Sequence, residues 1–206
     1  MAYPTVSAPY GLKPVNLIGG QVFAGATRMM EIASTSNVGY GTSIFYGDLV
    51  KRVTGGTIEL DAGTTTATPC GVFLGCSFTN ASTGQIQQQQ FYPASQAIKA
   101  GTKIFAVVAD DPDTLFQVVS CSSTTTVAGM GIAAIGANIA LIQNAGSTTT
   151  GNSAVAIDQG TETTTNTLPI RIIDVVRETA TGADTFVEFI VKINATMHQY
   201  NNSTGV

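Results

Sequence analysis

The chain has 206 residues, with nine Lys and Arg residues against thirteen Asp and Glu residues and a formal net charge of −4. Only 11% of the residues are charged, whereas an ordinary soluble domain carries about 25%. So few basic residues, none of them clustered, exclude the electrostatic footprint of a nucleic-acid-binding protein. The 44% share of hydrophobic residues at low net charge excludes a disordered composition.

Residues 1–27 open the chain with Pro4, Pro9 and Pro14 and several glycines. Prolines at this spacing block a regular helix, interrupt a ladder of strand hydrogen bonds and are incompatible with the apolar stretch of a signal peptide. The pattern predicts an extended N-terminal arm. No apolar run in the chain reaches the length of about 20 residues that a membrane-spanning helix needs, so no membrane partner is expected.

Residues 28–200 are rich in Thr, Ser, Asn and Gly, which predicts an all-β domain, a β-sandwich or barrel-like fold of short antiparallel strands. Strands are expected at 29–33, at 43–53 with a break at Gly47 and Asp48, and at 57–60, and the last two form a hairpin. Further strands are expected at 70–79 and 86–92. The four consecutive glutamines at 87–90 favour an edge or interface strand.

The segments 103–109 and 114–120 flank the turn 110–113, which predicts a second hairpin because Asp and Pro are strong turn residues. Near the C-terminus, 168–177 and 185–193 predict a strand pair, and in the second strand apolar residues alternate with Glu188 and Lys192. The small polar residues 201–206 predict a flexible tail.

Residues 114–157 contain no Asp, Glu, Lys or Arg. Two interpretations stay open: a strand pair buried in the protein's own core, or a subunit interface, whose centre is typically depleted of charge. The low total charge favours assembly.

Catalytic chemistry has few candidates in this chain. The single histidine, His198, lies near an end that is expected to be mobile and has no neighbouring carboxylate to orient it. Cys70, Cys76 and Cys121 lack the spacing of zinc ligands and are expected to be buried thiols. We therefore predict no enzyme, no metal, no cofactor and no small-molecule substrate.

Two weaker motifs have structural explanations. The acidic residues at 110, 111 and 113 lack the closing Glu of a calcium loop and are expected to be turn residues. Gly129, Gly131 and Ala134 match the spacing of a dinucleotide loop, but no alternation of strands and helices surrounds them, so a packing role is predicted.

Several segments together resemble a known family. They are APYGLKPV at 8–15, GG at 19–20, FAGATR at 23–28 and IFYGDLVK at 44–51, followed by 138–144, 148–153, 156–158 and HQY at 198–200. They resemble the decoration or cement proteins of tailed bacteriophages, small structural proteins that sit on or beside the major capsid protein. The resemblance implies a non-enzymatic virion protein on the outer surface of the capsid. It would bind the lattice of the major capsid protein, commonly as a dimer or trimer, and reinforce the head. A head-tail joining protein or tail component could share these features.

An arm laid along a neighbouring subunit is compatible with this role, because prolines lower the cost of ordering an extended segment. The expected partner contacts are Tyr3, Pro4, Pro9, Tyr10, Leu12, Pro14, Val15 and Phe23. The main rival hypothesis is a host-glycan-binding fibre or adhesin module, which requires an exposed aromatic platform and is weakened by the absence of Trp. An enzyme that uses His198 ranks third.

Overall fold

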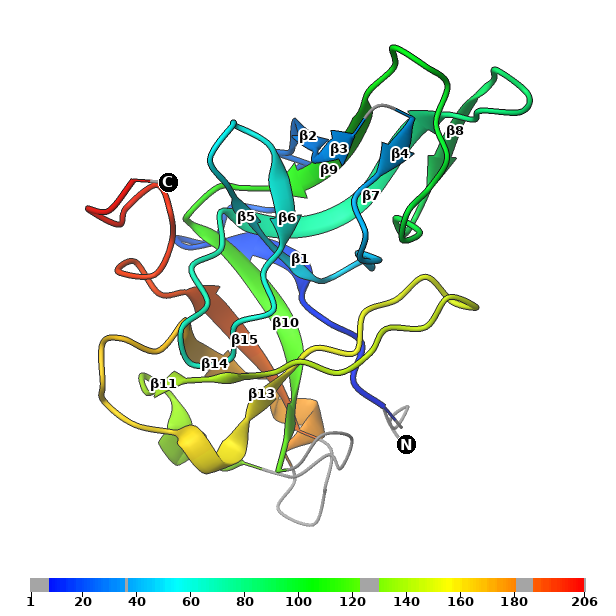
Figure 1. The fold of residues 1–206 in the computed structure, drawn as a ribbon. Coiled ribbons are helices and arrows are strands. Elements are labelled where there is room, and N and C mark those ends of the chain that lie inside the picture. The colour runs from blue at the N-terminus through cyan, green and yellow to red at the C-terminus, as the bar shows by residue number, and fades with distance from the viewer. Residues whose placement is uncertain (1–7, 36, 123–129, 181–186, 206) are drawn as a thin grey trace.

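Nearly all regular structure in this protein is β-strand, as Figure 1 shows. The computed structural model describes residues 8–35, 37–122, 130–180 and 187–205. Within these ranges there is no α-helix, and the only helical turns are the short 3₁₀ segments η1 (Ile132–Ala134), η2 (Gln159–Thr161) and η3 (Arg177–Thr179). No helix in the described ranges is long and apolar enough to cross a membrane. The predicted all-β, barrel-like class is confirmed.

Residues 28–109 build the first sheet, in the order β5-β6-β2-β9-β7-β8. Because β5 also pairs with β7, the sheet closes on itself and leaves β8 as an additional edge strand. The predicted hairpin before and after Gly55 is present as the antiparallel pair β5 and β6. The strands are β2 (Arg28–Ile32), β5 (Leu49–Arg52), β6 (Ile58–Leu60), β7 (Gly71–Thr79), β8 (Ile86–Gln89) and β9 (Ile104–Ala109), and β3 (Ser34–Thr35) and β4 (Val38–Gly39) form a separate small pair.

The second sheet has the order β11-β14-β15-β10-β13-β12, and β1 pairs with β10 as well. Only Ala140 separates β11 from β12, so this sheet also returns on itself. The predicted C-terminal strand pair is present as β14 and β15. The strands are β1 (Lys13–Leu17), β10 (Thr114–Cys121), β11 (Asn138–Ile139), β12 (Leu141–Ile142), β13 (Ala156–Asp158), β14 (Ile170–Val175) and β15 (Glu188–Ile193).

The predicted hairpin at 103–120 is wrong. The turn itself forms, with the Thr114 amide donating to the Asp111 carbonyl at 3.0 Å. Its two strands, however, enter different sheets: β9 pairs with β2 and β7, whereas β10 pairs with β1 and β15. The physical reason is that their apolar faces belong to different cores, with Val108 in the first and Phe116 in the second. The turn therefore links the two sheets.

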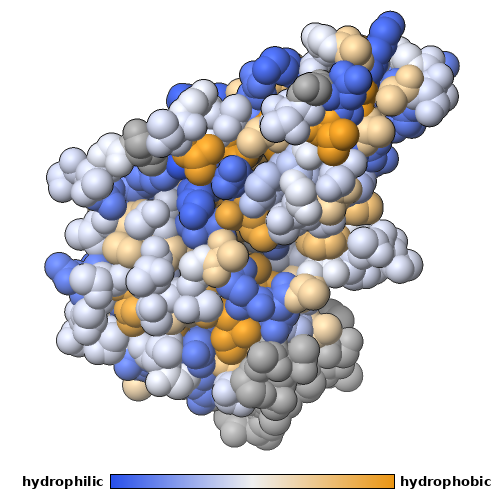
Figure 2. All heavy atoms as spheres, viewed as in Figure 1, coloured by the Kyte–Doolittle hydropathy of each residue, from blue (hydrophilic) through white to orange (hydrophobic). Residues whose placement is uncertain are grey.

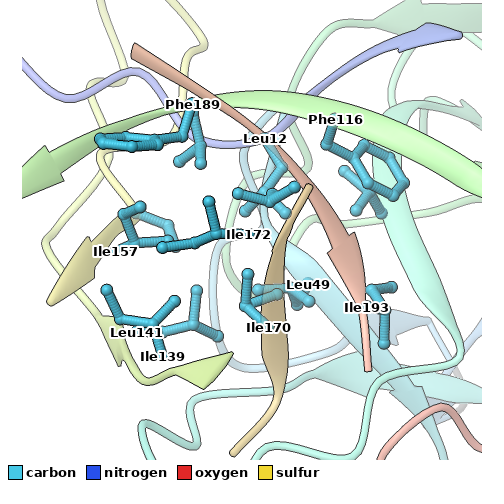
Figure 3. Packing of buried hydrophobic residues seen from close by; sticks show 14 of the residues in the cluster. Leu12, Leu49, Phe116, Ile139, Leu141, Ile157, Ile170, Ile172, Phe189 and Ile193 are labelled. Atoms are coloured by element: carbon cyan, nitrogen blue, oxygen red, sulfur yellow. The ribbon is translucent and has the colours of Figure 1, made fainter. Parts of the chain in front are cut away.

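Each sheet encloses its own apolar core. The first contains fully buried side chains such as Ile32, Phe73 and Tyr92. The second is larger, and in Figure 3 the side chain of Leu12 lies between those of Phe116 and Phe189, while Leu49 of β5 lies beside Ile170. Much of the second core comes from the segment 114–157. In the strands β10, β11, β12 and β13 themselves, the charge depletion is therefore explained by burial within the fold.

The N-terminal segment is not a free arm over its described part. Leu12 is fully buried in the second core, and β1 pairs with β10 in antiparallel register. The register shifts between Pro14 and Asn16, which marks an irregularity of the kind that lets a strand accommodate a proline. The prediction of an arm over residues 1–27 is thus corrected for residues 12–17, which are part of the domain.

Candidate functional site

A groove of about 750 Å³ lies between the N-terminal segment, the loop that precedes β13, and the strands β10 and β15. Polar side chains from four separate parts of the sequence meet there. Among the residues that line it are Pro9, Tyr10, Lys13, Gln117, Asn152 and Glu188. The groove therefore contains two of the predicted partner contacts, Pro9 and Tyr10.

A hydrogen-bond network fixes the floor of this groove. The Tyr10 hydroxyl donates to Oε1 of Glu188 at 2.6 Å, and Nε2 of Gln117 donates to Oε2 of the same carboxylate at 2.6 Å. Burial, followed by the bond to Glu188, raises the pKa of Tyr10 well above its ordinary value, so the phenol keeps its proton. Nζ of Lys13 lies 4.0 Å from the centre of the Tyr10 ring. The network ties the start of the chain to the sheet and satisfies a buried charge.

The N-terminal segment passes directly beside Gly47, which lies just before β5. The Gly11 amide donates to the Val155 carbonyl at 3.1 Å, and the Leu12 amide donates to the Gly47 carbonyl at 3.0 Å. A Cβ added at Gly11 would lie 2.6 Å from Cβ of Ser153, so only glycine fits at this position. Close backbone contact thus holds three segments together beside the groove.

A second polar cluster surrounds His198, which lies just before the residues 201–206 predicted to form a flexible tail. His198 is fully buried, because its backbone turns back on Asn194 and the Tyr200 amide donates to its Nδ1 at 3.2 Å. The Tyr200 hydroxyl donates to Oδ2 of Asp110 at 2.6 Å, and Nε of Arg28 lies 3.1 Å from the same oxygen. These contacts fasten the C-terminal residues to the turn between the sheets.

The His198 cluster lacks the arrangement of an acid-base catalyst. Oδ2 of Asp110 is engaged by Arg28 and Tyr200, and among the described residues no hydrogen bond joins this carboxylate to the imidazole. Burial raises the pKa of the Cys70 thiol to about 12, which leaves the thiol protonated and unreactive. Across the described ranges no three His, Cys, Asp or Glu residues gather as metal ligands. The predicted burial of the three cysteines, all free, is confirmed.

Replacing His198 with Asn should remove a loss of the free energy of unfolding that His198 causes as the pH falls below 6.5. Burial lowers the pKa of the imidazole below 6.5, with Lys192 acting in the same direction and Asp110 and Asp111 opposing it. Below pH 6.5 the unfolded chain therefore binds a proton that the folded chain excludes. His198 therefore does not reduce the free energy of unfolding at pH values above the pKa of the unfolded chain. The free energy of unfolding falls as the pH drops from that pKa to the lowered pKa of the folded chain.

Denaturant unfolding of both proteins, between about pH 8 and about pH 5, measures the effect. The oxygen of the new Asn can still accept the Tyr200 amide proton. Burial raises the pKa of Asp48 and of Asp61, so these carboxyl groups change the free energy of unfolding with pH in the opposite direction. Both proteins contain these groups, so their effect cancels in the comparison. Identical pH profiles for the two proteins would contradict the assignment.

The predicted contact residues are dispersed by the fold. Tyr3 and Pro4 lie outside the described residues. Leu12 belongs to the core, so it is wrong as a surface contact. The remaining residues are partly buried: Pro9 and Tyr10 beside the groove, Pro14 and Val15 within β1, and Phe23 against the second core.

Sequence reasoning missed a charge-free surface, which we call the neutral side and define as residues 37–47, 80–98 and 143–153. None of these residues is charged. Isolated β-bridges join the segments, from Val38 to Ala97, from Ile44 to Tyr92 and from Tyr46 to Asn152. Figure 1 places the three segments together on one side of the molecule. The sequence signal was available, because residues 62–98 are also free of charge.

Much of the neutral side is exposed, unlike the uncharged strands of the core. In Figure 2 residues of intermediate hydropathy cover the loop that projects from this side. Exposed examples from the three segments are Asn37, Thr42, Gln88, Ser95, Thr148 and Thr150. Burial in the protein's own core does not account for the lack of charge at these positions.

Comparisons with protein-family models, with curated proteins and with solved structures find no match. The function must therefore be argued from the chain's own surface. The surface offers two candidate contact regions, the groove beside Tyr10 and the neutral side.

Proposed function

We propose that this chain is a structural virion protein that binds the major capsid protein on the outer surface of a tailed-phage head and stabilises the shell. The neutral side is the observation that carries the proposal. Much of it is exposed, it is built from three segments that converge from distant parts of the sequence, and it carries no charge. The family resemblance of residues 8–51 and 138–200 supports the same role.

A charge-free surface suits an interface because an ion removed from water costs several kcal/mol unless it is paired. Hydroxyl and amide groups such as those of Thr148 and Gln88 need only a hydrogen-bond partner or a bridging water. The centres of protein interfaces are accordingly depleted of charged residues. On a shell of identical subunits, many such contacts act together, so a modest affinity at each position is sufficient.

Two other functions were open from the sequence. A glycan-binding module needs an exposed aromatic platform, but the exposed aromatic rings among the described residues are Phe105 and Tyr200, and Tyr200 already contacts Asp110 and Arg28. A head-tail joining or tail protein would need a similar uncharged surface, and it would differ by its location at a single vertex. We therefore favour the capsid lattice.

The test is binding to capsid shells assembled from the major capsid protein of the same virus. A double variant, Ser95→Lys with Thr149→Lys, places two charges on exposed positions of the neutral side. We expect its affinity to fall at least about tenfold, because each charge would be buried without a partner. Co-sedimentation of the protein with the shells measures occupancy.

The matched control is the double variant Thr54→Lys with Thr65→Lys, which adds the same charge at exposed turn positions elsewhere. It should bind as the wild type does. Equal binding by both double variants would contradict the neutral side as the contact. A wild-type protein that does not sediment with the shells would contradict the function itself.

A further inference from the structure

The segment that follows β15 returns to the first sheet, and we define its residues 194–200 as the C-terminal clasp. At its start, the Asn194 amide donates to the Pro169 carbonyl at 2.7 Å, just before β14 of the second sheet. Near its end, the Gln199 side chain accepts the Arg52 amide proton at 2.7 Å and donates to the Arg52 carbonyl at 3.1 Å, on β5 of the first sheet. The clasp is therefore anchored on both sheets.

The imidazole of His198 lies within the clasp in its neutral form. Its Nδ1 accepts the Tyr200 amide proton at 3.2 Å, so Nδ1 carries no hydrogen and Nε2 is the protonated nitrogen. The side chain is fully buried, and among the described residues Nε2 has no hydrogen-bond partner. A second proton would enter at Nδ1 and face the Tyr200 N–H, and the resulting charge would find an acceptor at neither nitrogen. The closed clasp therefore disfavours the imidazolium.

The charged groups that face this imidazole come from several elements and act in opposite directions. Burial is the main cause that lowers the pKa of the imidazole, and Lys192 on β15 acts in the same direction. Asp110 and Asp111, on the turn between the sheets, favour the proton and oppose the shift. Oδ2 of Asp110 already binds the Tyr200 hydroxyl of the clasp and Nε of Arg28 on β2. The closed clasp thus stays neutral at a pH at which a free imidazole is charged.

We propose that the clasp is an acid-sensitive switch: when His198 takes up a proton from water, residues 194–200 detach from the first sheet while both sheets remain folded. The opening is local because the clasp binds the first sheet and the linking turn through hydrogen bonds of Gln199 and Tyr200, whereas each sheet has its own apolar core. A rise in pH returns the proton to water and closes the clasp. The switch goes beyond the capsid-binding function and does not depend on it.

Cys70 provides a built-in reporter for the opening of the clasp. Its side chain is fully buried, and the Gln199 amide donates to the carbonyl of the preceding residue, Pro69, at 3.0 Å. The clasp therefore lies against the backbone next to this thiol. Detachment should make Cys70 accessible to a reagent, whereas Cys76 in β7 and Cys121 in β10 become accessible only when a sheet unfolds.

The experiment labels the thiols of the full chain with dithiodipyridine, which also reacts in acid, and mass spectrometry of peptides locates the label. Rates at about pH 8 and about pH 5 are each divided by the rate for free cysteine. We expect the corrected rate at Cys70 to rise at least about fivefold in acid. The ceiling is about 30-fold, the increase for an imidazole whose pKa is 6.5 in the open clasp. The rates at Cys76 and Cys121 should stay low.

Two variants separate the switch from the strength of the clasp. In His198→Asn the new oxygen can still accept the Tyr200 amide proton but does not titrate, so Cys70 should react at the same corrected rate at both pH values. Tyr200→Phe loses the hydrogen bond to Asp110 and keeps the imidazole. It should therefore react about fivefold faster at Cys70 even at about pH 8, and its rate should still rise in acid.

A wild-type rate at Cys70 that does not rise in acid would overturn the switch. So would an equal rise at all three cysteines, because it would report unfolding of the whole chain, or a rise that His198→Asn retains in full. The labelling uses the isolated chain, whereas the capsid test uses shells and the residues Ser95 and Thr149. A failure of one proposal is therefore distinguishable from a failure of the other.

Discussion

Leu12→Ala should lower the free energy of unfolding by about 2–5 kcal/mol, the usual loss when a buried leucine is truncated to alanine. Leu12 is fully buried, and it lies in the second core with Phe116 and Phe189. The surrounding sheet is closed, so it has little freedom to collapse into the space that the substitution leaves. Urea unfolding, followed by fluorescence or circular dichroism, measures the loss.

The control for this prediction is Val22→Ala. Val22 belongs to the same N-terminal segment but is 76% exposed, so its truncation should change the free energy of unfolding by less than about 0.5 kcal/mol. If Leu12→Ala were as mild as the control, residues 12–17 would be a dispensable arm after all. The comparison thus decides between a docking arm and a structural strand.

Gly11→Ala should destabilise the protein by about 3 kcal/mol. The φ angle of Gly11 is +79°, a left-handed conformation that costs an alanine about 1 kcal/mol. The added methyl group would also lie 2.6 Å from Cβ of Ser153 and 2.9 Å from the carbonyl oxygen of Gly47. Relief of these contacts would separate the N-terminal segment from both sheets.

Gly25→Ala provides a matched control, because Gly25 has the same φ of +79° but no atom within 4 Å of its added Cβ. It should show the conformational cost alone, about 1 kcal/mol. Thermal and denaturant unfolding of both variants therefore separates backbone strain from steric conflict. Equal losses of unfolding free energy in the two variants would mean that a methyl group at Gly11 fits beside Gly47 and Ser153 without steric conflict.

Local patterns predicted which residues form strands, but not always which strands pair. The alternation in β15 and the turn at Gly55 led to correct pairs because their partners are neighbours in the sequence. The turn at 110–113 has the same local signals, yet its flanking strands diverge. Pairing there is decided by the long-range burial of Val108 in one core and Phe116 in the other. Sequence spacing carries no information about that choice.

The candidate site shows the same limit. The prolines of residues 1–27 suggested an arm, but Pro14 lies beside a register shift and so does not prevent β1 from pairing. Glu188 alternates with apolar residues, a pattern typical of a water-facing side chain, yet it is only 9% exposed and accepts a hydrogen bond from the Tyr10 hydroxyl. The edge position of β8 was predicted correctly, from its glutamines. The charge-free run 62–98 signals part of the neutral side in the sequence, but its three segments come together only in the fold.

The chain order of the two sheets has a consequence for biosynthesis. All strands of the first sheet lie between residues 28 and 109, so this sheet can close while the rest of the polypeptide is still being translated. Strand β10 must wait for β15, which ends at Ile193, and until then Leu12 and β1 have no completed core to enter. A nascent chain stalled before residue 188 would consequently have a folded first sheet joined to a second half with exposed hydrophobic side chains and unpaired strands. Chaperones bind intermediates of this kind.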